Sequence, residues 1–148
     1  MGLFKIYELA SGTKADFAKT FGDNEVLRQQ ADIFWRSLEN SAPWLIITCL
    51  SLTILFVALY YKWYNNIPGR HYKPSHWFYW QIICFVFVGL GSFLVENLLL
   101  NLNLKGTTEI IINVSLLNAA IAFILYLLIS IGWCNIGKTN AYKFFKLK

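Results

Sequence analysis

Two long apolar runs separated by one short polar connection constrain this chain more than any other feature of its sequence. The runs are residues 78–100 and 110–133, and residues 101–109 connect them. Each run exceeds the roughly 20 apolar residues that a helix needs to cross a hydrocarbon layer of about 30 Å. The pair therefore predicts a transmembrane helical hairpin.

A third apolar run, residues 44–61, precedes the hairpin. Ser41 and Pro43 have the pattern of a helix cap followed by a first-turn proline, which predicts that a new helix starts here. Trp44 at one end and the aromatic residues from Tyr60 onward at the other indicate two membrane interfaces. We expect an all-α integral membrane protein of one domain, with three transmembrane helices preceded by short amphipathic N-terminal helices.

The N-terminal arm, residues 1–42, has apolar residues at helical spacing between its charges. Thr13 and Asp16 have the spacing of a capping pair for a short helix, and Asp23 is the expected N-cap of a longer one. We expect the apolar stripe of this longer helix to be buried in the lipid interface or against a partner. We favour contact with a partner protein, because the opposite face mixes charges of both signs. The stripe consists of Leu27, Ala31, Phe34 and Leu38.

The basic residues behind the net charge of +5 are distributed as in a membrane protein. The connection 62–76 has three basic residues and no acid, and the tail 134–148 has four lysines and no acid. Two crossings separate these segments, so they lie on the same side, which the positive-inside rule assigns to the cytoplasm. We expect an inner (plasma) membrane protein with its N-terminus outside and its C-terminus inside. The tail should lie on the lipid headgroups, and no nucleic acid partner is needed.

Glu96 is an acid inside an apolar run, where a charge costs roughly 2.5–3.5 kcal/mol. It must therefore be protonated, paired or facing water. At about 1.5 Å per residue, it lies at a depth similar to that of the polar residues of the third span. We expect one intramembrane polar cluster, formed by Glu96, Asn97, Asn113, Ser115 and Asn118. Small residues predict close helix packing at Gly89, Gly91, Ser92, Ala119 and Ala122.

This polar cluster permits two interpretations. Its amides and carboxyl group can join helices by hydrogen bonds, within or between subunits, or they can line a path for ions or water. No catalytic motif, nucleotide-binding loop or cysteine–histidine cluster accompanies it. The three cysteines fall in or at the end of apolar runs and are expected to be packed thiols. We therefore expect no catalytic residue, no metal and no cofactor.

Arg70 and His76 are six residues apart. This R-x5-H spacing resembles the short active-site motif of HEPN-type ribonucleases, in which an arginine and a histidine act at the scissile phosphate. The match covers two residues, and they lie in a proline-containing loop beside a membrane rather than on a soluble helical bundle. The resemblance implies a membrane-associated ribonuclease.

The leading expectation is a non-enzymatic multipass subunit that acts by oligomerising, with itself or within a larger envelope assembly such as a secretion or defence machine. Small-residue faces, buried amides and an amphipathic arm give this chain more adhesive surface than a 148-residue monomer can satisfy internally. A pore-forming or membrane-disrupting effector with a polar path near Glu96 is the first alternative. The HEPN-like ribonuclease is the second.

Overall fold

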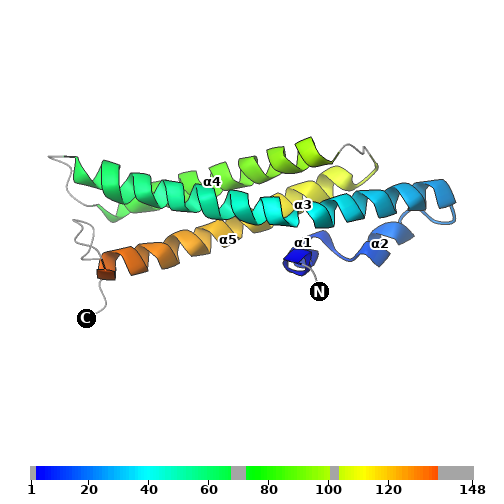
Figure 1. The fold of residues 1–148 in the computed structure, drawn as a ribbon, viewed down its shortest axis with the longest axis horizontal. Helices are drawn as coiled ribbons and strands as arrows, with labels where there is room; N and C mark the ends of the chain where they lie inside the picture. The colour runs from blue at the N-terminus through cyan, green and yellow to red at the C-terminus, as the bar shows by residue number, and fades with distance from the viewer. Residues whose placement is uncertain (1–2, 68–72, 101–103, 137–148) are drawn as a thin grey trace. The chain divides into compact units, whose positions relative to one another are not determined.

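The computed structural model describes residues 3–67, 73–100 and 104–136. This part of the chain is helical, without a strand (Figure 1), and three of its helices are long and apolar enough to cross a membrane. The expected all-α fold with three candidate spans is therefore confirmed. In order, the elements are η1 (Leu3–Ile6), α1 (Glu8–Ser11), α2 (Lys14–Lys19), α3 (Glu25–Ala58), the π-helical turn η2 (Leu59–Trp63), η3 (Tyr64–Asn66), α4 (Pro74–Leu99) and α5 (Thr107–Ile136).

Local capping explains where the N-terminal helices begin. The Thr13 hydroxyl donates to Oδ2 of Asp16 at 2.6 Å and accepts from the Asp16 backbone N–H at 3.2 Å, which confirms the predicted capping pair of α2. At α3, Oδ1 of Asn24 accepts from the Leu27 backbone N–H at 3.2 Å. Asn24 rather than Asp23 is therefore the N-cap, because only the residue directly before the first helical residue reaches that N–H. Asp23 instead forms a 3.6 Å ion pair with Arg28.

Helix α3 runs through Pro43 without interruption, so the predicted helix start at Ser41 and Pro43 is wrong. A proline inside a helix removes one backbone hydrogen bond and crowds the preceding turn, at a cost of roughly 3 kcal/mol. The turns on both sides of Pro43 are tightly packed, since Leu38, Ala42 and Leu45 are all buried. Burial of these side chains offsets the free-energy cost of the proline. The local sequence pattern around Pro43 does not show this burial.

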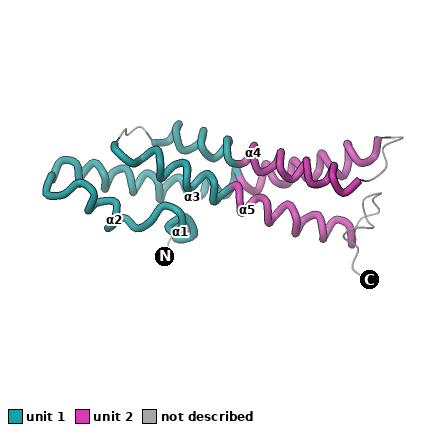
Figure 2. Tube along the Cα trace, turned by 180° about the vertical axis from the view of Figure 1, so that it is seen from behind, with its two compact units in different colours: residues 1–48, 89–118 teal, residues 49–88, 119–148 magenta. Residues whose placement is uncertain are grey.

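The chain forms two compact units, coloured separately in Figure 2. Unit 1 comprises residues 1–48 and 89–118, and unit 2 comprises residues 49–88 and 119–148. Helices α3, α4 and α5 each contribute residues to both units.

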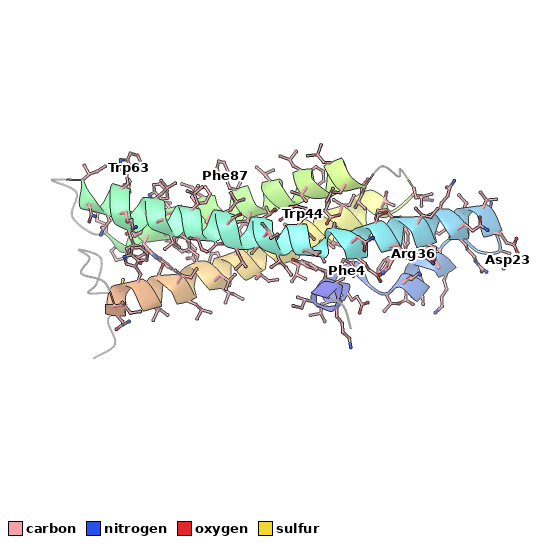
Figure 3. All side chains as sticks on the ribbon, in the orientation of Figure 1. Phe4, Asp23, Arg36, Trp44, Trp63 and Phe87 are labelled. Atoms are coloured by element: carbon pink, nitrogen blue, oxygen red, sulfur yellow. The ribbon has the colours of Figure 1, made fainter. Side chains whose placement is uncertain are left out.

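An aromatic core joins the N-terminal helices to the long helices of unit 1. The ring of Trp35 lies 5.8 Å from that of Phe4, labelled in Figure 3, and 6.1 Å from that of Phe17. The predicted stripe of α3 belongs to the same core: Ala31, Phe34 and Leu38 are buried and Leu27 is half-buried. For Ala31, Phe34 and Leu38, the expectation that lipid or a partner covers the stripe is therefore wrong, because the chain covers these residues with its own N-terminal segment.

Large aromatic side chains also dominate the core of unit 2. The ring of Tyr61 stacks on that of Trp133 at 5.7 Å, and Trp77 packs on Tyr126 at 5.6 Å. The indole N–H of Trp77 donates to Oγ of Ser130 at 3.0 Å, which ties α4 to α5. The cysteines are buried thiols, as predicted: Cys49, Cys84 and Cys134.

Candidate functional site

Asn118 is the centre of a buried hydrogen-bond network in unit 1. Its Nδ2 donates to Oγ of Ser92 at 2.6 Å and to the carbonyl oxygen of Leu45 at 3.0 Å. Its Oδ1 accepts from the hydroxyl of Tyr7 at 3.0 Å. One side chain of α5 thus binds to α4, to α3 and to the N-terminal segment. Such a network fixes one arrangement of these elements, because each buried partner loses its hydrogen bond if the arrangement changes.

A second polar contact lies one helical turn away, between α3 and α4. Oγ of Ser41 lies 2.6 Å from Oε1 of Glu96 and 2.7 Å from the carbonyl oxygen of Leu38. Glu96 and Ser41 are both almost completely buried, at 0% and 1% exposure. The acid is therefore enclosed by the protein itself.

Not all buried polar atoms of unit 1 are satisfied. Oε2 of Glu96, Oγ of Ser115 and Nε1 of Trp35 have no hydrogen-bond partner among the described residues. A buried polar atom without a partner costs roughly 1–3 kcal/mol. Three of them in one unit indicate a strained or incompletely occupied polar interior.

The predicted polar cluster is only partly brought together. Glu96, Ser115 and Asn118 are buried, whereas Asn97 is exposed and donates to the Phe93 carbonyl oxygen of its own helix at 2.7 Å. Asn113 is half-buried. Among the described residues, Glu96 forms no hydrogen bond with Asn113 or Asn118, because Ser41 of α3 is its partner.

Sequence reasoning missed Ser41 and Tyr7 as members of this network. The pattern at Ser41 predicts a helix cap, and Tyr7 is one of the apolar residues at helical spacing in the arm 1–42. Both patterns extend over only a few residues. Their actual partners, Glu96 and Asn118, are far away in the chain. The one sequence signal for this network was Glu96, because an acid inside an apolar run needs a hydrogen-bonding partner.

The small residues predicted for helix packing divide into two groups. Ser92, Ala119 and Ala122 are completely buried, in agreement with a packing role. Gly89 and Gly91 are half-buried.

A groove of about 930 Å³ lies beside α2 in unit 1. Its apolar floor includes Phe17, Phe21, Leu27 and Ile110, and the rings of Phe17 and Phe21 pack edge to face at 5.2 Å. Its charged lining residues are Asp16, Glu109 and Lys105, all exposed. The remaining lining residues are mostly polar: Ser11, Thr13, Thr20, Gln30, Leu104, Gly106 and Asn113. A groove of this size with an apolar floor and a few polar groups has the anatomy of a ligand or peptide site.

The carboxyl group of Asp16, at this groove, is stabilised in its ionised form. The hydrogen bond from Thr13 and the nearby Lys19 ammonium hold the pKa of Asp16 below its ordinary value. Asp16 is therefore an anion at neutral pH. Glu109 and Lys105 form no ion pair with another described residue, so both charges are available to a ligand.

The residues of the ribonuclease-like motif are described only in part. Nδ1 of His76 lies 3.2 Å from the hydroxyl of Tyr64. Arg70 lies outside the described residues, as does the predicted membrane-surface tail beyond residue 136.

In the described part of the chain, no group of three or more histidine, cysteine, aspartate or glutamate side chains could hold a metal ion. No protein family, curated protein or solved structure matches this chain.

Proposed function

We propose that this chain is a non-enzymatic three-span membrane subunit that acts by assembling with itself or with other proteins of a cell envelope. The observation that carries the proposal is the groove of unit 1, an open surface with an apolar aromatic floor and charged side chains at its edge.

The length of α3 supports a location of the groove outside the hydrocarbon layer. Trp44 and Trp63, both labelled in Figure 3, are more than half exposed, as expected for interfacial anchors. The helical residues between them amount to about 28 Å of helix, close to the hydrocarbon thickness of about 30 Å. Leu27 and Gln30 of the groove precede Trp44 by about four helical turns, so water rather than lipid meets the groove.

The occupant of the groove is a polypeptide segment of the assembled partner that carries apolar side chains beside a basic one. Its apolar side chains cover Phe21 and Leu27, whose surfaces otherwise face water. Its basic group complements Asp16 and Glu109. The lining contains these two acids and one basic residue, Lys105, so its charge is negative. Charge complementarity of this kind gives register and specificity to an interface.

The buried polar network supports an interpretation in which amides and carboxyl join helices within one chain. Asn118 forms three hydrogen bonds inside unit 1, and Glu96 is completely buried there. A conducting path would need these groups to face water. Their burial therefore weighs against a pore lined by Glu96. The orientation expected from the positive-inside rule belongs to the same proposal: the N-terminus and the groove outside, and the C-terminus in the cytoplasm.

Mass photometry of the detergent-extracted full chain tests this function. The parent should form an assembly larger than the monomer. The double variant Phe21→Ala, Glu109→Lys should shift it to the monomer, because it removes apolar floor and reverses the lining charge. Glu39→Lys makes the same charge change at an exposed position of α3 outside the groove and should leave the assembly intact. A parent that is monomeric at all concentrations would overturn assembly of the chain with itself, and an assembly that survives the double variant would remove the groove from it.

A further inference from the structure

The register of the three long helices places a second set of oxygen atoms about one helical turn from the Asn118 network. The hydrogen bond between Asn118 and Ser92 aligns α5 with α4. One helical turn from these residues lie Ser115 on α5 and Glu96 on α4, which share the faces of Asn118 and Ser92. Ser41 of α3 reaches Glu96 at 2.6 Å, so α3 joins at the same level. We call Ser41, Glu96 and Ser115 the oxygen layer.

The oxygen layer is rich in acceptors and poor in donors. Its polar atoms are the two carboxyl oxygens of Glu96, the hydroxyls of Ser41 and Ser115, and the nearby carbonyl oxygen of Leu38. Oε2 of Glu96 and Oγ of Ser115 are buried and have no partner among the described residues. Glu96 also forms no ion pair with a lysine, arginine or histidine of the described chain.

The oxygen layer has fewer hydrogen-bond donors than acceptors around Ser41. The single hydroxyl hydrogen of Ser41 is shared between two acceptors, the Leu38 carbonyl at 2.7 Å and Oε1 of Glu96 at 2.6 Å. If that hydrogen bonds to Leu38, two oxygen atoms with lone pairs face each other at 2.6 Å. A proton or a cation bound at the carboxyl group relieves this contact. If the hydrogen bonds to Glu96 instead, Ser41 satisfies Oε1, and only Oε2 of the carboxyl group needs an occupant.

We propose that the oxygen layer is a binding site for a monovalent cation of the sodium class. Carboxylate, hydroxyl and carbonyl oxygens are the ligands that hard cations prefer. One carboxylate neutralises one monovalent cation, whereas a divalent cation would leave a net positive charge in a buried site, at a high desolvation cost. The cation uses both unpartnered atoms, Oε2 of Glu96 and Oγ of Ser115. A bound proton is the competing occupant.

Thermal unfolding of the full chain in lipid nanodiscs at pH 8 tests the site, with NaCl, KCl and choline chloride compared at equal ionic strength. Sodium at 10 to 100 times its Kd should raise Tm by roughly 3 to 10 °C over choline. Glu96→Gln keeps the side-chain volume but removes the charge, so its Tm should be the same in all three salts. Ser115→Ala should move the NaCl midpoint several-fold higher while the protein stays folded in choline chloride.

Ser37→Ala is the matched control. The Ser37 hydroxyl donates to the Ile33 carbonyl oxygen of its own helix at 3.0 Å, away from the oxygen layer, so this variant should keep the parental response to sodium. A shift in KCl equal to that in NaCl supports a monovalent site without size selection. The same Tm in all three salts for the parent shows that only a proton binds and overturns the proposal. A sodium effect that persists in Glu96→Gln, or in Ser115→Ala with an unchanged midpoint, overturns it equally.

Discussion

Unit 1 and unit 2 take residues from the same three long helices but hold them together differently. Unit 1 contains all eight acidic residues of the chain and joins its helices by buried hydrogen bonds centred on Asn118. The described part of unit 2 contains no acid and only two lysines, Lys62 and Lys73. Its helices meet mainly through large aromatic rings, such as Tyr61 on Trp133.

This difference predicts different responses to mutation. A ring packed on rings provides contact area that neighbouring side chains can partly restore. A buried hydrogen-bond network has no such tolerance, because the loss of one member leaves the others without partners. Polar substitutions should therefore damage unit 1 more than unit 2, which the Asn118 and Trp77 variants below test directly. The Trp35 and Asp16 variants measure the aromatic core and the exposed cap that unit 1 has besides its network.

The largest effect is expected from Trp35→Ala in the aromatic core of unit 1. Trp35 is completely buried against Phe4 and Phe17, so the cavity should lower the free energy of unfolding by roughly 3–5 kcal/mol. Trp35→Phe keeps most ring contacts and removes an indole N–H that has no partner, so it should cost far less. Denaturant titration in detergent measures both. Equal losses for the two variants would contradict the assignment of the cost to ring packing.

Asn118→Leu should lower the free energy of unfolding by roughly 2–4 kcal/mol, because it removes the hydrogen bonds that join Asn118 to Tyr7, Ser92 and the Leu45 carbonyl. Hydrogen exchange should rise in η1 and α1, which lose the Tyr7 anchor, and stay unchanged in unit 2. Asn97→Leu makes the same substitution at an exposed asparagine that bonds only within α4. If both leucine variants behave alike, the network is not what orders the N-terminal segment.

Trp77→Phe tests the contrast from the side of unit 2. It removes the hydrogen bond to Ser130 but keeps an aromatic ring beside Tyr126, so we expect a loss of about 1 kcal/mol. Hydrogen exchange should change only in unit 2. A loss as large as that of Asn118→Leu would show that hydrogen bonds are as important in unit 2 as in unit 1.

The smallest effect concerns the exposed cap of α2. The pKa of Asp16 is lower in the folded chain than in the unfolded chain, because Thr13 and Lys19 stabilise its carboxylate. Its contribution is therefore present above the ordinary pKa near 3.8 and is lost as pH falls through the lower, folded value. NMR titration of the Asp16 carboxyl should show this low pKa in the parent and a rise toward the ordinary value in Thr13→Ala. An unchanged pKa in that variant would contradict the cap as its cause.

The sequence by itself determined the features that depend on neighbouring residues. The three apolar helices follow from runs long enough to cross a bilayer, and the start of α2 follows from the capping pair Thr13 and Asp16. The buried side of α3 follows from the spacing of Ala31, Phe34 and Leu38. Periodicity and capping act over one or two helical turns, so they are visible in a single sequence.

Only the tertiary structure decided what those surfaces contact. In the structure, Glu96 forms a hydrogen bond with Ser41 rather than with an asparagine of α5. Asn118 forms hydrogen bonds with Tyr7, Ser92 and the Leu45 carbonyl. Helix α3 also continues through Pro43, because burial of the turns around the proline outweighs the backbone penalty. These outcomes depend on contacts between residues 26 to 111 positions apart, such as Asn118 with Ser92 and with Tyr7. Local propensities carry no information about such pairs, since each partner is chosen by the packing of the whole unit.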